Sequence, residues 1–153
     1  GSEMCIRDRV DAACGSRFYN FEKTKDGGTT WTEVNGDPFD QNMGVAEGLL
    51  FFTNDFGFAG LTYASEDFSM LYVTKDGGET FERLELPLDT VTELPSESAE
   101  LGFTIEDYDY HTMPQIVDGK MEIYLQTDAM EQQGIIFQSE DNGVTWEYAG
   151  CKE

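Results

Sequence analysis

Three copies of one octapeptide pattern constrain the fold of this chain more than any other feature of its sequence. Box 1 spans residues 24–31 (TKDGGTTW), box 2 spans 74–81 (TKDGGETF), and box 3 spans 139–146 (SEDNGVTW). The Asp-Gly-Gly and Asp-Asn-Gly runs supply the positive-φ positions that tight reversals require between apolar segments. Each box is therefore predicted to be a turn between two antiparallel strands.

The residues within each box have distinct predicted roles. The aspartate accepts hydrogen bonds from N–H groups of its own turn, a hydroxyl residue stands on the other arm, a glycine supplies the reversal, and an aromatic residue buries against the sheet. These residues are Thr24, Asp26, Gly28, Trp31, Thr74, Asp76, Gly78, Phe81, Ser139, Asp141, Gly143 and Trp146. No box has the D-x-[DN]-x-[DN]-G spacing of a calcium loop. We therefore expect structural aspartates, with no metal and no cofactor.

The pattern S/T-x-D-x-G-x-T-W/F resembles the Asp-box, or BNR, repeat of sialidases, sortilin-type receptors and photosystem II stability-factor-like proteins. The resemblance implies an all-β fold of antiparallel four-stranded blades, here about two and a half blades of a β-propeller. The box aspartates lie at positions 26, 76 and 141, which fits one blade per repeat with an insertion in the last. The expected divisions are a half blade at 10–35, a blade at 36–87, and a blade with an acidic insertion at 88–153.

Hydrophobic patterning places the strands around the boxes. In 120–126, Met121, Ile123 and Leu125 share one face of a strand, because successive side chains of a strand point to opposite faces. The polar stretch 92–100 is too long for an ordinary hairpin loop and is predicted to be a surface insertion. The predicted strands are 17–24, 30–34, 48–53, 58–64, 69–74, 80–86, 112–117, 120–126, 134–139 and 145–149.

The first nine residues, GSEMCIRDR, have a different predicted origin. Read as codons, they resemble a sequencing adapter translated in frame, so we expect residues 1–9 to be non-native and leave them out of the prediction of the fold. Natural sequence would then begin near Val10, in a gene fragment from a metagenome that lost its upstream blades. A partial ring exposes strand edges, which predicts self-association of the chain through those edges.

Charge excludes some partners. The 153-residue chain has 31 acidic and 9 basic residues and a net charge of −22, which repels nucleic acids and anionic membrane surfaces. No apolar run approaches the roughly 20 residues of a membrane helix. Cys14 and Cys151 either pair, contributing about 4 kcal/mol in the chain-entropy model, or remain two thiols. An acidic, turn-rich chain with this cysteine pair suggests an extracellular or cell-surface protein.

Candidate functional residues are few. In the resembled family, sialidase chemistry uses an arginine triad, a tyrosine nucleophile with a glutamate, and an acid/base aspartate. Outside the first nine residues only Arg17 and Arg83 are present, so no catalytic residue is predicted. A ligand-binding set is predicted in 106–111 (EDYDYH), where aromatic and acidic side chains suit sugars; the alternative is an insertion loop anchored by tyrosines. The set is Asp107, Tyr108, Tyr110 and His111.

Two functions remain open from the sequence. The first is an exported, non-catalytic Asp-box propeller that binds a protein or glycan partner. The alternative is the C-terminal blades of a sialidase-type or other glycoside hydrolase, whose catalytic residues lie mainly in a missing N-terminal part. Abundant acidic residues do not discriminate between them, because glycoside hydrolysis requires a particular carboxylate pair.

Overall fold

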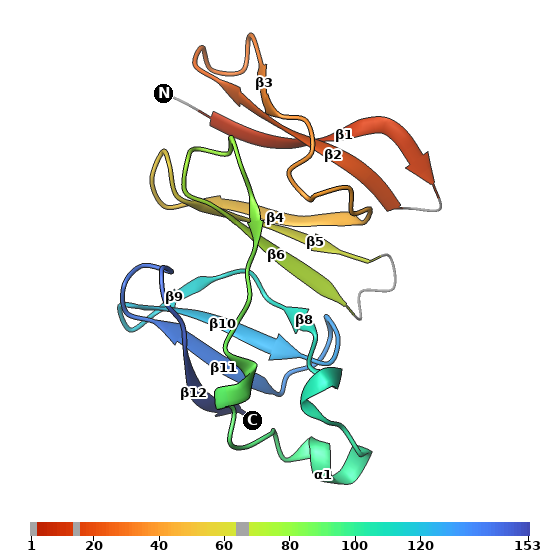
Figure 1. Cartoon of the computed structure of the whole chain (residues 1–153), viewed down its shortest axis with the longest axis vertical. Helices are drawn as coiled ribbons and strands as arrows, with labels where there is room; N and C mark the ends of the chain where they lie inside the picture. Colours follow the sequence, from red (N-terminus) through yellow and green to blue (C-terminus); the bar gives the residue numbers. More distant parts are fainter. Residues whose placement is uncertain (1–2, 14–15, 64–67) are drawn as a thin grey trace. The chain divides into compact units, whose positions relative to one another are not determined.

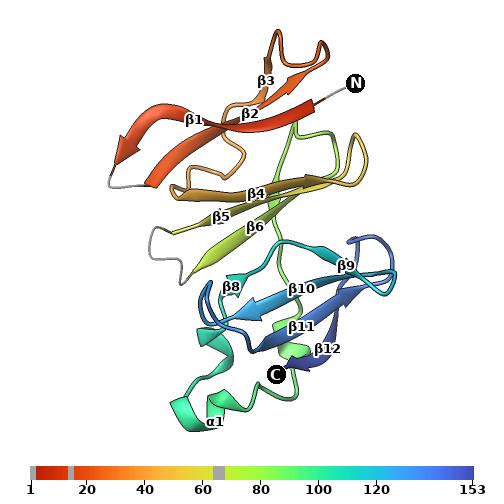
Figure 2. The ribbon, with the colours of Figure 1, turned by 180° about the vertical axis from the view of Figure 1, so that it is seen from behind.

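The computed structural model describes residues 3–13, 16–63 and 68–153, and these residues form an all-β fold of three antiparallel sheets (Figure 1). The chain divides into two compact units, Gly1–Ala64 with Met70–Leu84, and Ser65–Ser69 with Glu85–Glu153. Figure 2 shows the strands of each sheet from behind. The predicted all-β, antiparallel class is confirmed.

The first sheet of the first unit contains β1 (Glu3–Ala13), β2 (Ser16–Thr24) and β3 (Thr32–Asn35), in that order. The pairing of β1 with β2 is antiparallel and runs from Glu3 opposite Thr24 to Ala13 opposite Ser16. The sequence predicted two strands for the first repeat, 17–24 and 30–34, and the structure adds β1 to them as a third. An unpaired edge of β2 would leave N–H and C=O groups without partners, and β1 satisfies them. The origin of residues 1–9 in an adapter stays a prediction.

The second sheet has the order β4-β5-β6-β7. Its strands are β4 (Val45–Phe51), β5 (Gly57–Thr62), β6 (Ser69–Thr74) and β7 (Glu82–Arg83). β5 is buried along its whole length and has a neighbouring strand on each of its edges. β7 is shorter than the predicted 80–86, because only Arg83 and Glu82 pair with β6, opposite Tyr72 and Val73.

Aromatic side chains hold these two sheets together within the first unit. The Phe21 ring of β2 is fully buried and stacks on Phe51 of β4, with ring centroids 5.6 Å apart. It also meets Phe81 of box 2 edge-on at 5.5 Å. Offset and edge-on contacts of this kind add to the free energy gained by burying the rings. Box 2 is thereby packed against the neighbouring sheet.

The second unit contains the third sheet, in which β8 (Tyr110–His111), β10 (Lys120–Gln126), β11 (Gly134–Ser139) and β12 (Glu147–Lys152) are neighbours and β9 (Gln115–Val117) also pairs with β10. Met121, Ile123 and Leu125 are buried on one face, as their alternation predicts. Of the predicted strand 112–117, only 115–117 forms a strand, β9, and β8 lies just before that range. Pro114 lies between them, and proline has no N–H to donate to a ladder.

The insertion between β7 and β8 forms a cover segment, residues 88–109, on the third sheet. It contains η1 (Leu88–Thr90), α1 (Glu97–Leu101) and η2 (Ile105–Asp107), and the sequence from 84 to 119 has no lysine or arginine. Tyr148 and Cys151 of β12 both donate to the Glu93 carbonyl, at 3.2 and 3.3 Å. They lie opposite Phe137 and Ile135 in the ladder, so the cover segment lies on the apolar face of β11 and β12.

Candidate functional site

The three boxes form nearly identical turns, each between the last two strands of its sheet. The first hydroxyl of each box donates to the aspartate Oδ1 at 2.7–2.8 Å and accepts the N–H of the glycine four residues later at 2.8–3.0 Å. These glycines, Gly28, Gly78 and Gly143, have φ between 92° and 93°. The repeated octapeptide thus specifies one repeated backbone conformation, because glycine adopts positive φ without steric cost.

The box aspartates are occupied by hydrogen bonds within their own turns. In box 1, Thr30 donates its N–H to Asp26 Oδ1 at 2.8 Å and its hydroxyl to Oδ2 at 2.5 Å. These bonds, with that from Thr24, lower the pKa of Asp26 from 3.8 to about 2. Thr145 and Ser139 likewise lower the pKa of Asp141 to about 2. Hydrogen-bond donors stabilise the charged form of each carboxylate. The two aspartates therefore fit a structural role, in which each holds its own turn in place.

Box 2 has the same pattern in a more crowded setting. Burial acts to raise the pKa of Asp76, but hydrogen bonds from Thr80 and Thr74 outweigh it and leave that pKa lowered.

The aromatic positions differ more between boxes. Trp31 and Trp146 donate from Nε1 to the carbonyl of the box glycine at 3.1 Å. The third aromatic residue is a phenylalanine, which has no donor, and it packs on the neighbouring sheet instead.

The predicted ligand-binding set does not converge on one open surface. Tyr108 and Tyr110 are buried, 2% and 8% exposed, so their rings offer no face for a sugar. Asp107 accepts the N–H of Thr104 at 2.7 Å and caps η2. The backbone N–H of His111 donates to Ser69 Oγ at 2.6 Å. Ligand binding by these four residues stays a prediction, and this geometry does not favour it.

A tyrosine–glutamate pair on the third sheet was missed by the sequence reasoning. Tyr124 donates to Glu122 Oε1 at 2.8 Å, and Gln138 donates to Glu122 Oε2 at 2.6 Å. Burial, followed by the hydrogen bond with Glu122 and its charge, raises the pKa of Tyr124 to about 12. A phenol with a raised pKa is a poor nucleophile at neutral pH. The alternation of β10 places both residues on one face, a signal that was available in the sequence.

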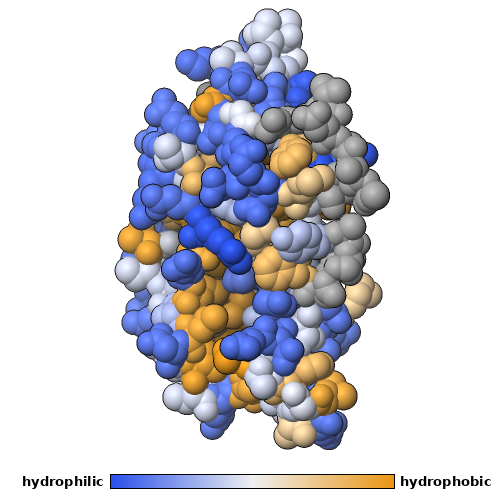
Figure 3. Space-filling view, turned by 45° about the vertical axis from the view of Figure 1, so that its right-hand side comes forward, coloured by the Kyte–Doolittle hydropathy of each residue, from blue (hydrophilic) through white to orange (hydrophobic). Residues whose placement is uncertain are grey.

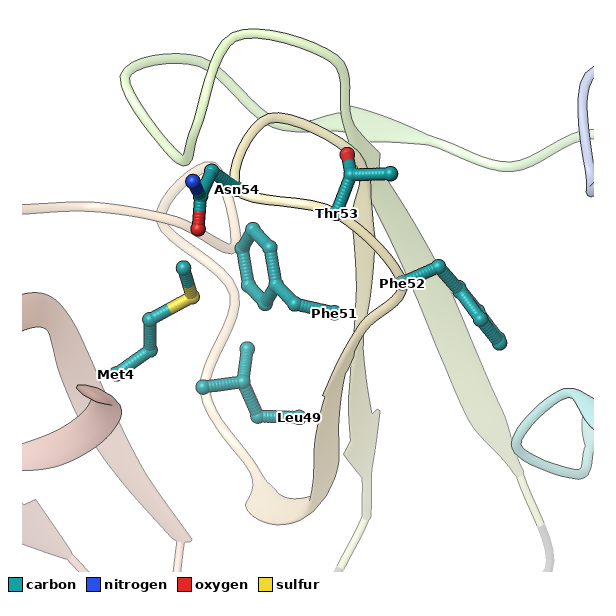
Figure 4. Close-up of a pocket in the computed structure, with 6 residues that line it drawn as sticks. All are labelled: Met4, Leu49, Phe51, Phe52, Thr53 and Asn54. Carbon is teal, nitrogen blue, oxygen red and sulfur yellow. The ribbon is translucent and has the colours of Figure 1, made fainter. Parts of the chain in front are cut away.

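A cavity of about 640 Å³ lies beside β4 and the turn that follows it (Figure 4). Leu49 and Phe51 point toward Met4 of β1, Asn54 lies at the same opening, and Phe52 points away. These residues and Thr53 make up the lining. None of them titrates near neutral pH, so the lining offers apolar, aromatic, amide and hydroxyl surface without an acid or base. Such surface suits binding better than proton transfer.

Other site types receive no support from the part of the chain that is described. Within 3–13, 16–63 and 68–153, no group of three or more His, Cys, Asp or Glu side chains is arranged to hold a metal ion. Among the same residues, no helix has the length and apolar character needed to cross a bilayer. Cys14 lies outside the described residues and Cys151 carries a free thiol, so their pairing stays a prediction.

Comparison with known proteins adds no further constraint. No protein-family model, curated protein or solved structure matches this chain. The candidate site therefore depends on the chain's own geometry and charge. Figure 3 shows hydrophilic side chains over much of the face that it presents, as the net charge of −22 leads one to expect, with smaller hydrophobic areas between them.

Proposed function

We propose that this chain is a non-catalytic binding module from an exported Asp-box β-propeller, and that it holds a neutral sugar in the cavity beside β4. The observation that carries this proposal is the lining of the cavity by Leu49, Phe51, Thr53 and Asn54, with no acid or base among the described residues around it. Aromatic and aliphatic surface suits the C–H faces of a sugar, while amide and hydroxyl groups suit its hydroxyls.

The propeller part of the proposal rests on repetition. Each sheet has one box between its last two strands, and the first two sheets pack through Phe21, Phe51 and Phe81. One turn of the same conformation per sheet is what a blade repeat produces. Partial rings of this kind expose strand edges, so self-association belongs to the same proposal.

A neutral sugar is favoured over other ligands by size and charge. The hollow beside β4, at about 640 Å³, lies in the size range of small-ligand sites. A net charge of −22 opposes acidic sugars and polyanions. Among the described residues that line the cavity there is no arginine to offset that repulsion.

The test uses two matched substitutions on β4. Leu49 points into the cavity and its neighbour Leu50 lies on the opposite face of the strand, because side chains alternate along it. Leu49→Ala should weaken binding of neutral oligosaccharides by about tenfold, measured by array screening and then calorimetry, because it removes part of the apolar wall. Leu50→Ala should leave the dissociation constant unchanged.

Four further outcomes bear on the proposal. Met4→Ala should retain binding if residues 49–54 supply most of the contact, which matters because Met4 lies in the segment predicted to be adapter-derived. Binding that is equally sensitive to Leu49→Ala and Leu50→Ala would locate the ligand elsewhere. Capture of a protein partner with no sugar binding would replace the sugar in the proposal, and hydrolysis of any glycan by the chain would overturn its non-catalytic part.

A further inference from the structure

The cover segment carries an apolar groove that is separate from the cavity beside β4. The groove has a volume of about 320 Å³, and the residues that line it all belong to the second unit. One wall comes from η1 and the residues that follow it, and the other comes from the residues at the start of η2. The apolar lining of this groove, which we call the cover groove, consists of Leu88, Val91, Leu94, Phe103 and Ile105.

Contacts within the cover segment hold both walls of the groove in place. On one wall the Phe103 ring packs edge-on against the buried Tyr108, with ring centroids 6.1 Å apart. Tyr108 in turn donates its hydroxyl to Glu97 at 3.0 Å. On the other wall the N–H of Val91 donates to the carbonyl of Leu88 at 3.2 Å. Because the groove is formed before a ligand arrives, little conformational entropy is lost on binding.

Part of the apolar surface of the cover groove is in contact with solvent. The Leu88 side chain is 44% exposed, and the other four apolar lining residues are half-buried. Exposed apolar surface that is bordered by polar groups marks an interaction site. An apolar side chain of a partner would remove this surface from water, which favours binding.

Carboxylates stand on both walls of the cover groove. Glu93 belongs to the lining, and Asp89 lies in η1. On the opposite wall, Glu106 and Asp107 lie in η2. All four acidic residues are exposed. A partner that fills the groove therefore gains most if it brings positive charge to both sides of its apolar part.

The second unit has few cations of its own to neutralise these carboxylates. Its sequence contains two lysines, Lys120 and Lys152, and no arginine. The Nζ of Lys120 lies 2.9 Å from Glu140 Oε1. The Nζ of Lys152 lies 4.9 Å from the centroid of the Tyr124 ring. Both lysines thus contact other groups of the unit, and the surface around the cover groove remains negative.

We propose that the cover groove docks a basic peptide segment of a partner protein, with an apolar side chain in the groove and lysines or arginines on the carboxylates of both walls. Charge favours this occupant over others. A second copy of the chain would bring a further net charge of −22, and nucleic acids and anionic membranes are repelled in the same way. A small organic cation has its charge at one point, whereas a peptide presents charges on either side of its apolar anchor.

Fluorescence anisotropy with the full chain and labelled hexapeptides tests the proposal. KKLFKK has both the apolar anchor and the basic flanks, KKSSKK keeps the charge without the anchor, and EELFEE keeps the anchor with the opposite charge. KKLFKK should bind about tenfold more tightly than KKSSKK, because the groove removes its apolar side chains from water. EELFEE should not bind. Added salt should weaken the binding of KKLFKK, since mobile ions screen exposed charges.

Two leucines provide matched substitutions that locate the apolar anchor. Leu88 lines the groove, whereas Leu101, in α1, is 61% exposed and lies outside the lining. Leu88→Ser should weaken the binding of KKLFKK by about tenfold, and Leu101→Ser should leave it unchanged. Both side chains are already in contact with solvent, so thermal unfolding of the two variants should resemble that of the unaltered chain.

Two glutamates separate contact at the groove from the general effect of charge. Glu93 lines the groove, and its backbone carbonyl, which a substitution keeps, accepts the hydrogen bonds from β12. Glu100 is exposed on α1 and lies outside the lining. Each change to glutamine removes one negative charge. Glu93→Gln should weaken the binding of KKLFKK by about threefold, and Glu100→Gln by less, because solvent and salt screen the more distant charge.

The outcomes distinguish this proposal from the sugar proposal and from other occupants. The proposal is overturned if KKLFKK does not bind, or if KKSSKK binds as tightly, since charge alone would then attract the peptide. Equal losses in Leu88→Ser and Leu101→Ser would locate the peptide elsewhere. Sedimentation of the chain alone that changes in Leu88→Ser, without peptide binding, would make a second copy the occupant. Leu49→Ala should leave the binding of KKLFKK unchanged, because the cavity beside β4 lies in the other unit.

Discussion

The box turns and the cover segment both place acidic side chains at the centre of their hydrogen bonding, yet they treat the charge in opposite ways. Asp141 meets only donors, the hydroxyls of Ser139 and Thr145 and the Thr145 N–H. Glu97 accepts the hydroxyl of the buried Tyr108, and burial followed by the neighbouring Glu131 raises its pKa. The first arrangement stabilises the carboxylate and the second stabilises the carboxylic acid. In a chain of net charge −22, local donors decide which form is favoured.

The two regions also differ in how tightly they are packed. At Gly78 of box 2 an added Cβ would clash with the fully buried Phe21 ring, whereas at Gly102 of the cover segment it would meet nothing within 4 Å. In a tightly packed region an added atom displaces its neighbours and lowers the free energy of unfolding, whereas a region with free space accommodates the atom. Identical substitutions made in both regions can therefore test whether the difference is real.

The largest expected contrast comes from one glycine in each region. Gly78 and Gly102 both have positive φ, but an added Cβ at Gly78 would lie 2.1 Å from Phe21 Cε1, and at Gly102 it would meet nothing within 4 Å. Gly78→Ala should cost about 3 kcal/mol of unfolding free energy, from backbone strain plus overpacking, and Gly102→Ala about 1 kcal/mol from strain alone. Urea unfolding provides the measurement.

Variants that keep a single tryptophan show which unit loses stability, because the fluorescence of that tryptophan reports on the unit that contains it. Trp31 lies in the first unit and Trp146 in the second. Phenylalanine already occupies the equivalent position of box 2, so Trp31→Phe and Trp146→Phe are mild backgrounds. Equal costs for the two glycine substitutions would contradict the packing difference.

A smaller contrast is expected from one serine in each region. Ser139 is 2% exposed and its Oγ accepts the buried Gly143 N–H at 2.8 Å, so Ser139→Ala should cost about 1–3 kcal/mol by leaving that donor unsatisfied. Ser96 is exposed and its hydroxyl contacts Glu153, and Ser96→Ala should stay within about 0.5 kcal/mol. Thermal unfolding of both variants at one pH is sufficient. A larger loss for Ser96→Ala would reverse the ranking of the two regions.

The smallest effect is expected in the dependence of the unfolding temperature on pH below about pH 4. Because the pKa of Asp141 is lowered from 3.8 to about 2, its contribution is complete above 3.8 and is lost as the pH falls through about 2. Asp141→Asn should reduce the unfolding temperature at neutral pH and flatten its decline below about pH 4. The change is modest, because exposed charges are screened by solvent. An unchanged decline below about pH 4 would mean that Asp141 is not held by its turn.

The sequence was most informative where local pattern and turn chemistry agree. Residues 69–74, 120–126 and 134–139 are strands with the predicted bounds, since alternating or continuous apolar runs end at turn residues. It failed at β1, because a segment set aside for its origin still pairs with a free strand edge. It also missed the cover groove, whose two walls come together only through tertiary structure. No periodicity links residues on different loops, so that groove had no sequence signal.

The absence of lysine and arginine between Arg83 and Lys120 has a practical consequence for digestion of the native protein. Trypsin cleaves only after those two residue types, so it leaves the cover segment as one peptide whether the segment is attached or not. A glutamate-specific protease meets candidate bonds at Glu93, Glu97, Glu100 and Glu106. Cutting by the glutamate-specific enzyme thus reports on the accessibility of the cover segment, within which trypsin has no site.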